Sequence, residues 1–126
     1  MQICASAILD NAILEGAILD NADLSQADLK AANLSQANLS QAELFEADLS
    51  KADLEAADLS GADLAIANLN QANLNQAALE RANLRGANLK NANLDGTILE
   101  GGDRNLATWT KPKAPFQFWK SAFGVW

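Results

Sequence analysis

Hydrophobic residues recur with a period of five along most of this chain. Leu occupies every fifth position from Leu9 to Leu99, and Ala stands two residues before each Leu except at Thr97. The residue between Ala and Leu is mostly Asp or Asn, and we call its place the outward position. The register covers residues 2–101, which makes 20 units of five residues.

A period of five fits neither an α-helix nor a flat β-strand. On a helix, successive Leu side chains would advance by about 500° and scatter around the axis. On a strand, an odd period would turn alternate Leu side chains to opposite faces. All of them reach one interior if the chain turns a corner in every unit, and four corners close a coil. The pattern therefore predicts a β-solenoid of about five coils, roughly 24 Å tall at the usual spacing of stacked strands.

The other residue types of the unit agree with such a coil. Leu fills the interior, Ala is its small inward neighbour, and Asp or Asn can hydrogen-bond its own backbone at a turn. The two residues after Leu form the corner, and we call them the first and second corner positions. Every Gly of the repeat falls at the second corner position: Gly16, Gly61, Gly86, Gly96 and Gly101. We therefore expect a positive φ at some of these corners.

These units resemble the pentapeptide-repeat family of bacterial type. The resemblance rests on Ala-Asp-Leu and Ala-Asn-Leu segments such as residues 27–29, 47–49 and 72–74, and it covers about four fifths of the chain. It implies an all-β fold, a right-handed quadrilateral β-helix with Leu and Ala inside and the outward position on the surface. The departures at the outward position are Ile3, Ile8, Ile13, Ile18, Ile98 and Ala78.

The repeat ends at Gly101-Gly102, which we interpret as a hinge. Residues 1–102 are therefore predicted to form the solenoid and residues 103–126 a C-terminal tail. Every Trp and three of the four Phe lie after residue 105, since a Leu and Ala interior has no room for rings.

The aromatic tail is predicted to cap the last coil. The cap residues are Trp109, Phe116, Trp119, Phe123 and Trp126. From Phe116 onward they recur at helical spacing, so a short helix is one form that the cap can take. A terminal repeat needs such a cover. A dimer interface and a membrane-surface contact are the alternatives, of which membrane contact is the least favoured.

Composition excludes most catalytic chemistry. The chain has 16 acidic and 9 basic residues, a net charge of −7, one Cys and no His. Without His the commonest general base and metal ligand are missing, and a single Cys forms no internal disulfide. We predict no enzyme activity, no cofactor and no metal, and an acidic chain argues against direct nucleic-acid binding. The absence of a leader or a long apolar run favours the cytoplasm.

Acidic residues gather at the outward positions of the first half of the repeat. Seven of the nine outward positions from Asp23 to Asp63 are acidic. Residues four units apart stack, so Asp23, Glu43 and Asp63 form a column on one face. One interpretation is that Asp and Asn are interchangeable turn formers that keep the rod soluble. The columns lack the spacing of a Ca²⁺ loop.

A second interpretation of the acidic residues is a DNA mimic that binds gyrase or another topoisomerase, as some family members do. Residues 2–101 carry a net charge of −10. A DNA duplex carries about 14 charges over roughly 24 Å, which is a comparable density. However, residues 67–96 sum to +1, whereas a duplex mimic stays negative along its length.

Exposed apolar residues that the repeat does not require point to contacts with other molecules. Phe45 takes a first corner position and Ile66 a second corner position one coil later, so they are expected to lie together beside Asp23, Glu43 and Asp63. The alternative is that these exposed apolar side chains have no binding role.

The Ile residues at the outward positions of the first coil form a second candidate surface. They are Ile3, Ile8, Ile13 and Ile18, one on each face. They suggest an end contact with another copy or with a partner, unless the first coil bends and buries them. The function predicted from the whole sequence is a rigid, non-enzymatic scaffold for an unidentified protein partner, as a monomer or a weak end-to-end dimer.

Overall fold

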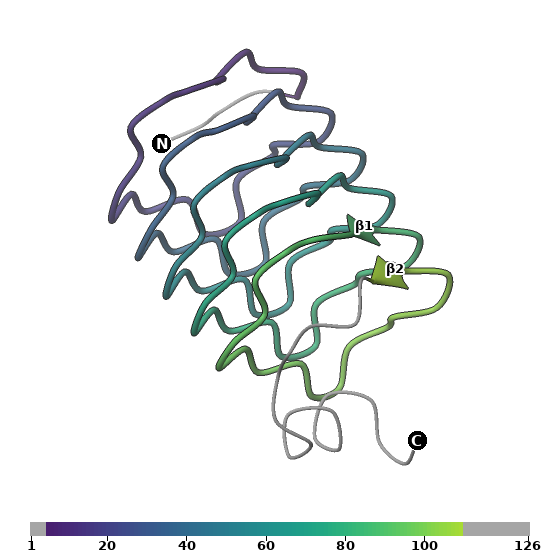
Figure 1. Ribbon diagram of the computed structural model, residues 1–126. Helices are drawn as coiled ribbons and strands as arrows, with labels where there is room; N and C mark the ends of the chain where they lie inside the picture. Colours follow the sequence, from purple (N-terminus) through teal and green to yellow (C-terminus); the bar gives the residue numbers. More distant parts are fainter. Residues whose placement is uncertain (1–4, 110–126) are drawn as a thin grey trace.

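The chain winds into stacked coils around a common axis (Figure 1). The computed structural model describes residues 5–109. Isolated parallel bridges join each outward residue to the residue twenty positions later, from Ile8 with Asp28 to Asn83 with Asp103. Four five-residue units therefore make one coil, and consecutive coils lie in register.

Only two strands are longer than a single bridge in the described residues. Strand β1 is Asn88–Leu89 and strand β2 is Thr108–Trp109, and they pair in parallel with Asn88 opposite Thr108. Elsewhere each unit contributes one bridging residue, because the chain turns again before a second residue can pair. The corners, rather than extended strands, set the shape of the coil.

Most units with Asp or Asn at the outward position use their backbone N–H groups in the same way, as residues 48–52 illustrate. Asp48 donates to the preceding coil, and Leu49 and Lys51 donate to the following coil, at N···O distances of 2.7–2.9 Å. The Ala52 N–H closes the corner onto the Leu49 carbonyl at 3.0 Å. The Ser50 N–H bonds to Oδ1 of Asp48 at 3.0 Å, which is an Asx turn. All five N–H groups therefore have partners, four on the backbone and one on the outward side chain.

The Leu and Ala columns form a continuous core along the axis. Every Leu from Leu19 to Leu99 is at most 2% exposed. Leu9 and Leu14 are only partly buried, because they lie at the first described coil. Thr97, the one departure in the Ala column, is buried, and its hydroxyl donates to the Leu74 carbonyl at 3.0 Å. From Leu19 to Leu99 the interior is thus apolar except for one hydroxyl that has its acceptor.

The coil continues beyond the predicted boundary at Gly102. Asp103 bridges to Asn83, and β2 pairs with β1, so the backbone pattern runs to Trp109. Gly102 takes the Ala place of a unit, and a Cβ there would lie 2.5 Å from the Ala82 carbonyl oxygen, so the close stacking of the coils favours Gly at this position. The Leu column does end near the predicted boundary, because the next inward place holds half-buried Arg104.

The second corner position has a positive φ in every unit from Ser6 to Leu106. Sixteen of these residues are not glycine, with φ between 56° and 64°. The expectation of a positive φ at only some corners was therefore too narrow. The left-handed conformation belongs to the corner itself and not to the residue that occupies it.

Several predicted features lie outside the described residues. They are Ile3, Cys4, Phe116, Trp119, Phe123 and Trp126. The aromatic cap therefore stays a prediction, and only the backbone of Trp109 is placed, in β2. Residues 5–109 contain no helix long and apolar enough to cross a bilayer.

Candidate functional site: a corner surface around Phe45 and Ile66

Phe45 and Ile66 lie on adjacent coils at the same corner of the solenoid. The Glu46 N–H donates to the Ala65 carbonyl at 3.0 Å, so residues 45–46 stack directly on residues 65–66. The corner joins two faces, one with the outward column of Asp23, Glu43 and Asp63 and the other with that of Asp28 and Asp48. We call Phe45, Ala65 and Ile66 the corner patch.

The side chains of the corner patch differ in exposure. Ile66 is 57% exposed and Phe45 is 36% exposed. Ala65 stands between Phe45 and Arg85 in the stack of first corner positions and is only 8% exposed. The neighbouring second corner position on the next coil is Gly86, whose absent Cβ would lie 3.5 Å from Cγ1 of Ile66. Gly86 therefore places no side chain beside Ile66 on that side.

Ile66 is held in an unfavourable backbone conformation. Its φ is 59°, and a β-branched side chain in the left-handed region is a real outlier. The other non-glycine residues at this position carry no branch at Cβ (Ser, Asn, Gln, Ala, Glu, Lys, Arg and Leu). Because Ile66 is exposed, burial in the core does not explain its presence. Strain of this kind is often retained for function.

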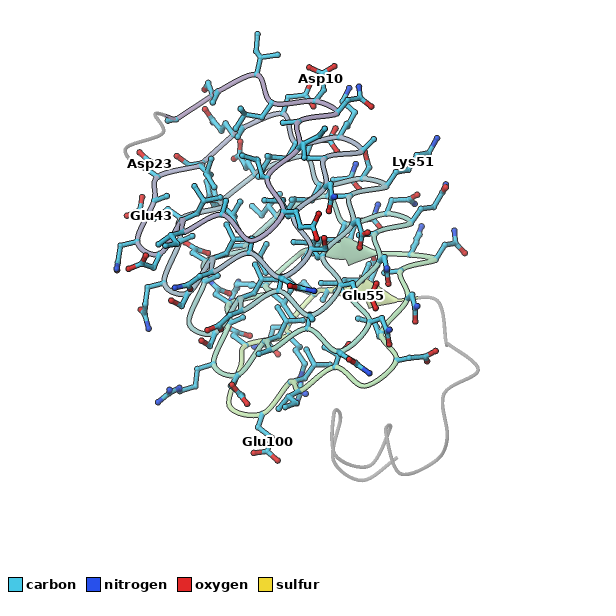
Figure 2. The ribbon with its side chains drawn as sticks, turned by 90° about the vertical axis from the view of Figure 1, so that its left-hand side faces the viewer. Asp10, Asp23, Glu43, Lys51, Glu55 and Glu100 are labelled. Atoms are coloured by element: carbon cyan, nitrogen blue, oxygen red, sulfur yellow. The ribbon has the colours of Figure 1, made fainter. Side chains whose placement is uncertain are left out.

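Carboxylates concentrate on the two faces that meet at this corner. Six outward positions there are acidic: Asp23, Asp28, Glu43, Asp48, Asp63 and, near the other end, Asp103. The other two faces have one outward carboxylate each, Asp53 and Asp58. Figure 2 shows Asp23 and Glu43 one above the other along one side, with Lys51 and Glu55 on the opposite side. The negative charge of the outward columns is therefore one-sided.

The carboxylates near the patch are oriented by hydrogen bonds. Oδ1 of Asp23 accepts from the Ser25 hydroxyl at 2.6 Å and from the Ser25 N–H at 3.1 Å, and these bonds lower the pKa of Asp23. Oδ1 of Asp63 accepts from the Ala65 N–H and from Nδ2 of Asn83, both at 3.1 Å. Glu46 accepts from Nε2 of Gln26 at 3.1 Å. The surface thus presents fixed anions.

Basic residues stand around this surface. Lys30 lies 3.9 Å from Oδ2 of Asp28 in an exposed ion pair, and exposed Lys51 stands on the next coil at the same corner, at the edge of that face away from the patch. Arg85 is exposed in the coil after Ala65. In residues 5–109 no group of three Cys, Asp or Glu side chains is placed to hold a metal ion.

The Ile residues of the first coil project from the surface. Ile8, Ile13 and Ile18 are 81%, 84% and 71% exposed, so the alternative in which the coil buries them is wrong for these three. Ile has no acceptor for the Asx turn, so the bond that other units form is missing at these corners. The sequence interpretation passed over Leu106, which is 76% exposed near the other end. Its place at a second corner position is the feature of the sequence that indicates this exposure.

Comparisons with known proteins agree with this architecture. The family model for pentapeptide repeats matches residues 4–36, 22–61 and 62–101, with eight copies. The crystal structure of Rfr23, a pentapeptide repeat protein from the cyanobacterium Cyanothece 51142, is 46% identical over 75% of this chain, with a TM-score of 0.72. This chain covers 65% of the length of that structure.

A pentapeptide repeat protein of the Arabidopsis thaliana thylakoid lumen is 27% identical, with a TM-score of 0.62. That likeness covers 91% of this chain and 68% of the other. No curated protein matches the sequence. The matched repeats extend over most of the chain, and the bridges every twenty residues follow them: the protein belongs to the pentapeptide-repeat family.

Proposed function

We propose that this protein is a rigid, non-enzymatic scaffold that binds another protein through the corner patch. Ile66 is the observation that carries the proposal. It combines a branched side chain, a left-handed backbone and 57% exposure, a combination that weakens folding and adds apolar surface. The fold does not require Ile at this position, whereas a contact with a partner explains an exposed apolar side chain there.

The surroundings of Ile66 suit a binding surface. Phe45 supplies the neighbouring ring, and aromatic side chains are frequent among residues that dominate binding energy. The backbone of the corner is bonded to the coils on either side, as in the 2.8 Å bond from the Gln26 N–H to the Phe45 carbonyl. A surface fixed in this way loses little conformational entropy when it binds.

The distribution of charge gives less support to a DNA mimic. Amides interrupt the acidic columns, where Asn68 follows Asp48, Asn73 follows Asp53 and Asn83 follows Asp63, and in the described residues only Asp103 follows as a further outward carboxylate. A duplex presents charge at regular intervals along its full length and around its circumference. A supercoiling assay with purified gyrase tests this alternative, and we expect neither inhibition nor protection at micromolar protein.

Affinity capture with matched variants tests the proposal. Phe45→Ser with Ile66→Asn removes the corner patch, and Ile98→Asn with Leu106→Asn removes similar apolar surface elsewhere. We expect wild type and the Ile98/Leu106 variant to capture a set of proteins that the Phe45/Ile66 variant does not capture. Circular dichroism should show that both variants are folded. If folded variants and wild type capture the same proteins, the corner patch is not the binding surface.

We also propose the right-handed winding and the aromatic cap that the family resemblance and the tail sequence indicate. A cap over the last Leu coil would cover the apolar ends of the columns near Leu94 and Leu99. Removal of residues 110–126 is then expected to lower the melting temperature. An unchanged melting temperature would contradict the cap.

A further inference from the structure

We infer that the segment of the partner that contacts the corner patch is basic and amphipathic: a large apolar side chain flanked by Lys or Arg. This inference rests on the proposed function, which supplies the surface. It adds the charge and the apolar character of the partner segment, which we argue from the charges around the patch.

The first step is the ring of charge around the patch. Glu43 and Asp63 stand on one adjoining face, Asp48 stands on the other, and Glu46 lies at the corner itself beside Ile66. Lys30, whose Nζ lies 3.9 Å from Oδ2 of Asp28, and Lys51 both stand at the far corner of that face. Arg85 adjoins the patch from the next coil only. An apolar group that enters the patch is therefore surrounded mainly by carboxylates, which repel an acidic partner and attract a basic one.

The second step is that these carboxylates are already held in position. Asp23 is bonded to Ser25, Asp63 to Ala65 and Asn83, and Glu46 to Gln26, at distances from 2.6 to 3.1 Å. A carboxylate has about four lone-pair sites, so one or two such bonds leave room for a Lys or Arg. Hydrogen bonds to the Asp23 carboxylate keep it ionised, since they lower its pKa.

The third step is the length of the segment. The column from Asp23 to Asp63 spans three successive coils, or about 10 Å at the usual strand spacing. An extended chain covers that distance in three or four residues. The expected motif is therefore short: a Phe, Leu, Ile or Trp with Lys or Arg within about three residues on either side.

Selection from a library of random 12-residue peptides displayed on phage, against the full chain, tests the inference. We expect the enriched peptides to contain this motif and to lose affinity as salt rises. The test variant combines Asp23→Asn, Glu43→Gln and Asp63→Asn, because Asn retains the Oδ1 acceptor of the Asx turn. The matched control removes three charges from the opposite side with Asp53→Asn, Glu55→Gln and Asp58→Asn.

The expected affinity changes follow from the strength of exposed ion pairs. Each such pair contributes roughly two- to fivefold, so the test variant is expected to bind the enriched peptides about tenfold more weakly and the control within about twofold of wild type. Enriched peptides without Lys or Arg, equal affinity for the test variant, or a selection that enriches nothing would each overturn the inference.

The variant that lacks the patch separates this inference from the proposed function. If Phe45→Ser with Ile66→Asn abolishes peptide binding while the charge variant does not, the patch binds proteins but the basic partner is wrong. If the folded patch variant binds every peptide as wild type does, the proposed function is wrong as well.

Discussion

The left-handed backbone at the second corner position is the most demanding local feature of the coil. A residue with a Cβ in this conformation costs roughly 1–2 kcal/mol relative to the right-handed region. The position recovers part of that cost because its N–H donates to the next coil, as from Lys51 to the Asn70 carbonyl at 2.9 Å. Gly and Asn tolerate the conformation best, and a β-branched residue tolerates it least.

Ile66→Asn is therefore expected to stabilise the protein. The substitution relieves the branched side chain at φ 59° and removes an exposed apolar group, so we expect the free energy of unfolding to rise by about 1 kcal/mol. Urea unfolding followed by circular dichroism measures it. Gln71→Asn at the same position of the next unit is the control and should change stability by less than about 0.5 kcal/mol. Destabilisation by Ile66→Asn would mean that the fold itself needs Ile66.

The Asp23–Ser25 bonds give a prediction about protonation. The Ser25 hydroxyl and N–H stabilise the ionised carboxylate, so the pKa of Asp23 lies below its ordinary value. The bonds therefore add stability above the ordinary pKa, and that stability is lost as the pH falls through the lowered value. In Ser25→Ala the pKa of Asp23 should rise, as measured by NMR titration, whereas Ser25→Thr retains a hydroxyl and should keep the pKa low. An unchanged pKa in Ser25→Ala would assign the shift to another cause.

At the residue scale the sequence predicted which side chains face the interior and which face the surface of the coil. It did not predict the backbone conformation of every corner. Leu, Ala and Asp occupy their places almost without exception, so their periodicity shows directly. The second corner position holds Gln, Ala, Lys or Glu more often than Gly. Its conformation comes from the closure of the turn and from hydrogen bonds to neighbouring coils, which leave no consistent residue type. The strain at Ile66, on which the candidate site depends, could not be predicted for that reason.

At the scale of the unit, the outward Asp or Asn is a structural part of the corner. In residues 48–52 it accepts the one N–H that has no backbone partner, and Ser50 adds a 2.7 Å bond from its hydroxyl. Columns of Asn add bonds between coils, as from Asn73 to Asp53 at 3.1 Å. Units without Asp or Asn at this place give up this bond.

Ala78→Asn is expected to restore the Asx turn in one such unit. The new Oδ1 would accept the Glu80 N–H, and the amide would lie over Asp58 as Asn73 lies over Asp53. We expect a gain of about 1 kcal/mol in the free energy of unfolding, measured by urea titration. Asp48→Ala, which removes the same bonds from a complete unit, should lose a similar amount. A loss of stability in Ala78→Asn would show that the outward side chain contributes little to the corner.

The last units show where the sequence pattern was underestimated. The sequence predicted that the repeat ends at Gly101-Gly102, and the following Leu place holds Arg104. However, Asp103 keeps the outward position and Ala107 the Ala column, and the backbone follows them to Trp109. The backbone pattern therefore continues where Leu is absent from the inward place. The Leu column is needed for the core and ends at Leu99.

At the scale of the whole molecule, the repeat fixes the backbone and leaves the surface free to vary. Sequence periodicity predicted the family, and the match over residues 4–101 confirms it. The same register predicted that Phe45 and Ile66 share a corner, because residues twenty positions apart stack. The one-sided distribution of outward carboxylates is visible only when the columns are assigned to faces. It distinguishes this protein from a rod that is acidic on all sides.

The first coil provides the prediction that concerns the assembly of the molecule. Ile8, Ile13 and Ile18 are the most exposed Ile side chains described, and each replaces an Asx residue at the outward position. They lie on three faces of one coil, so they form a partial girdle near one end and not a patch on one side. Such a girdle suits a contact along the axis with a second copy. The protein is therefore expected to associate weakly as its concentration rises.

Replacement of all three residues by Asn should change stability and association in opposite directions. Each Asn supplies an Oδ1 acceptor for the N–H two residues later, so the free energy of unfolding should rise by about 2 kcal/mol in total. Loss of the apolar side chains should remove the increase of sedimentation coefficient with concentration that we expect for wild type. Ile98→Asn restores an acceptor at the other end of the rod and should leave association unchanged. A wild-type protein that sediments as a strict monomer at high concentration would rule out the end contact, whereas a stabilised triple variant that still associates would place the contact elsewhere on the rod.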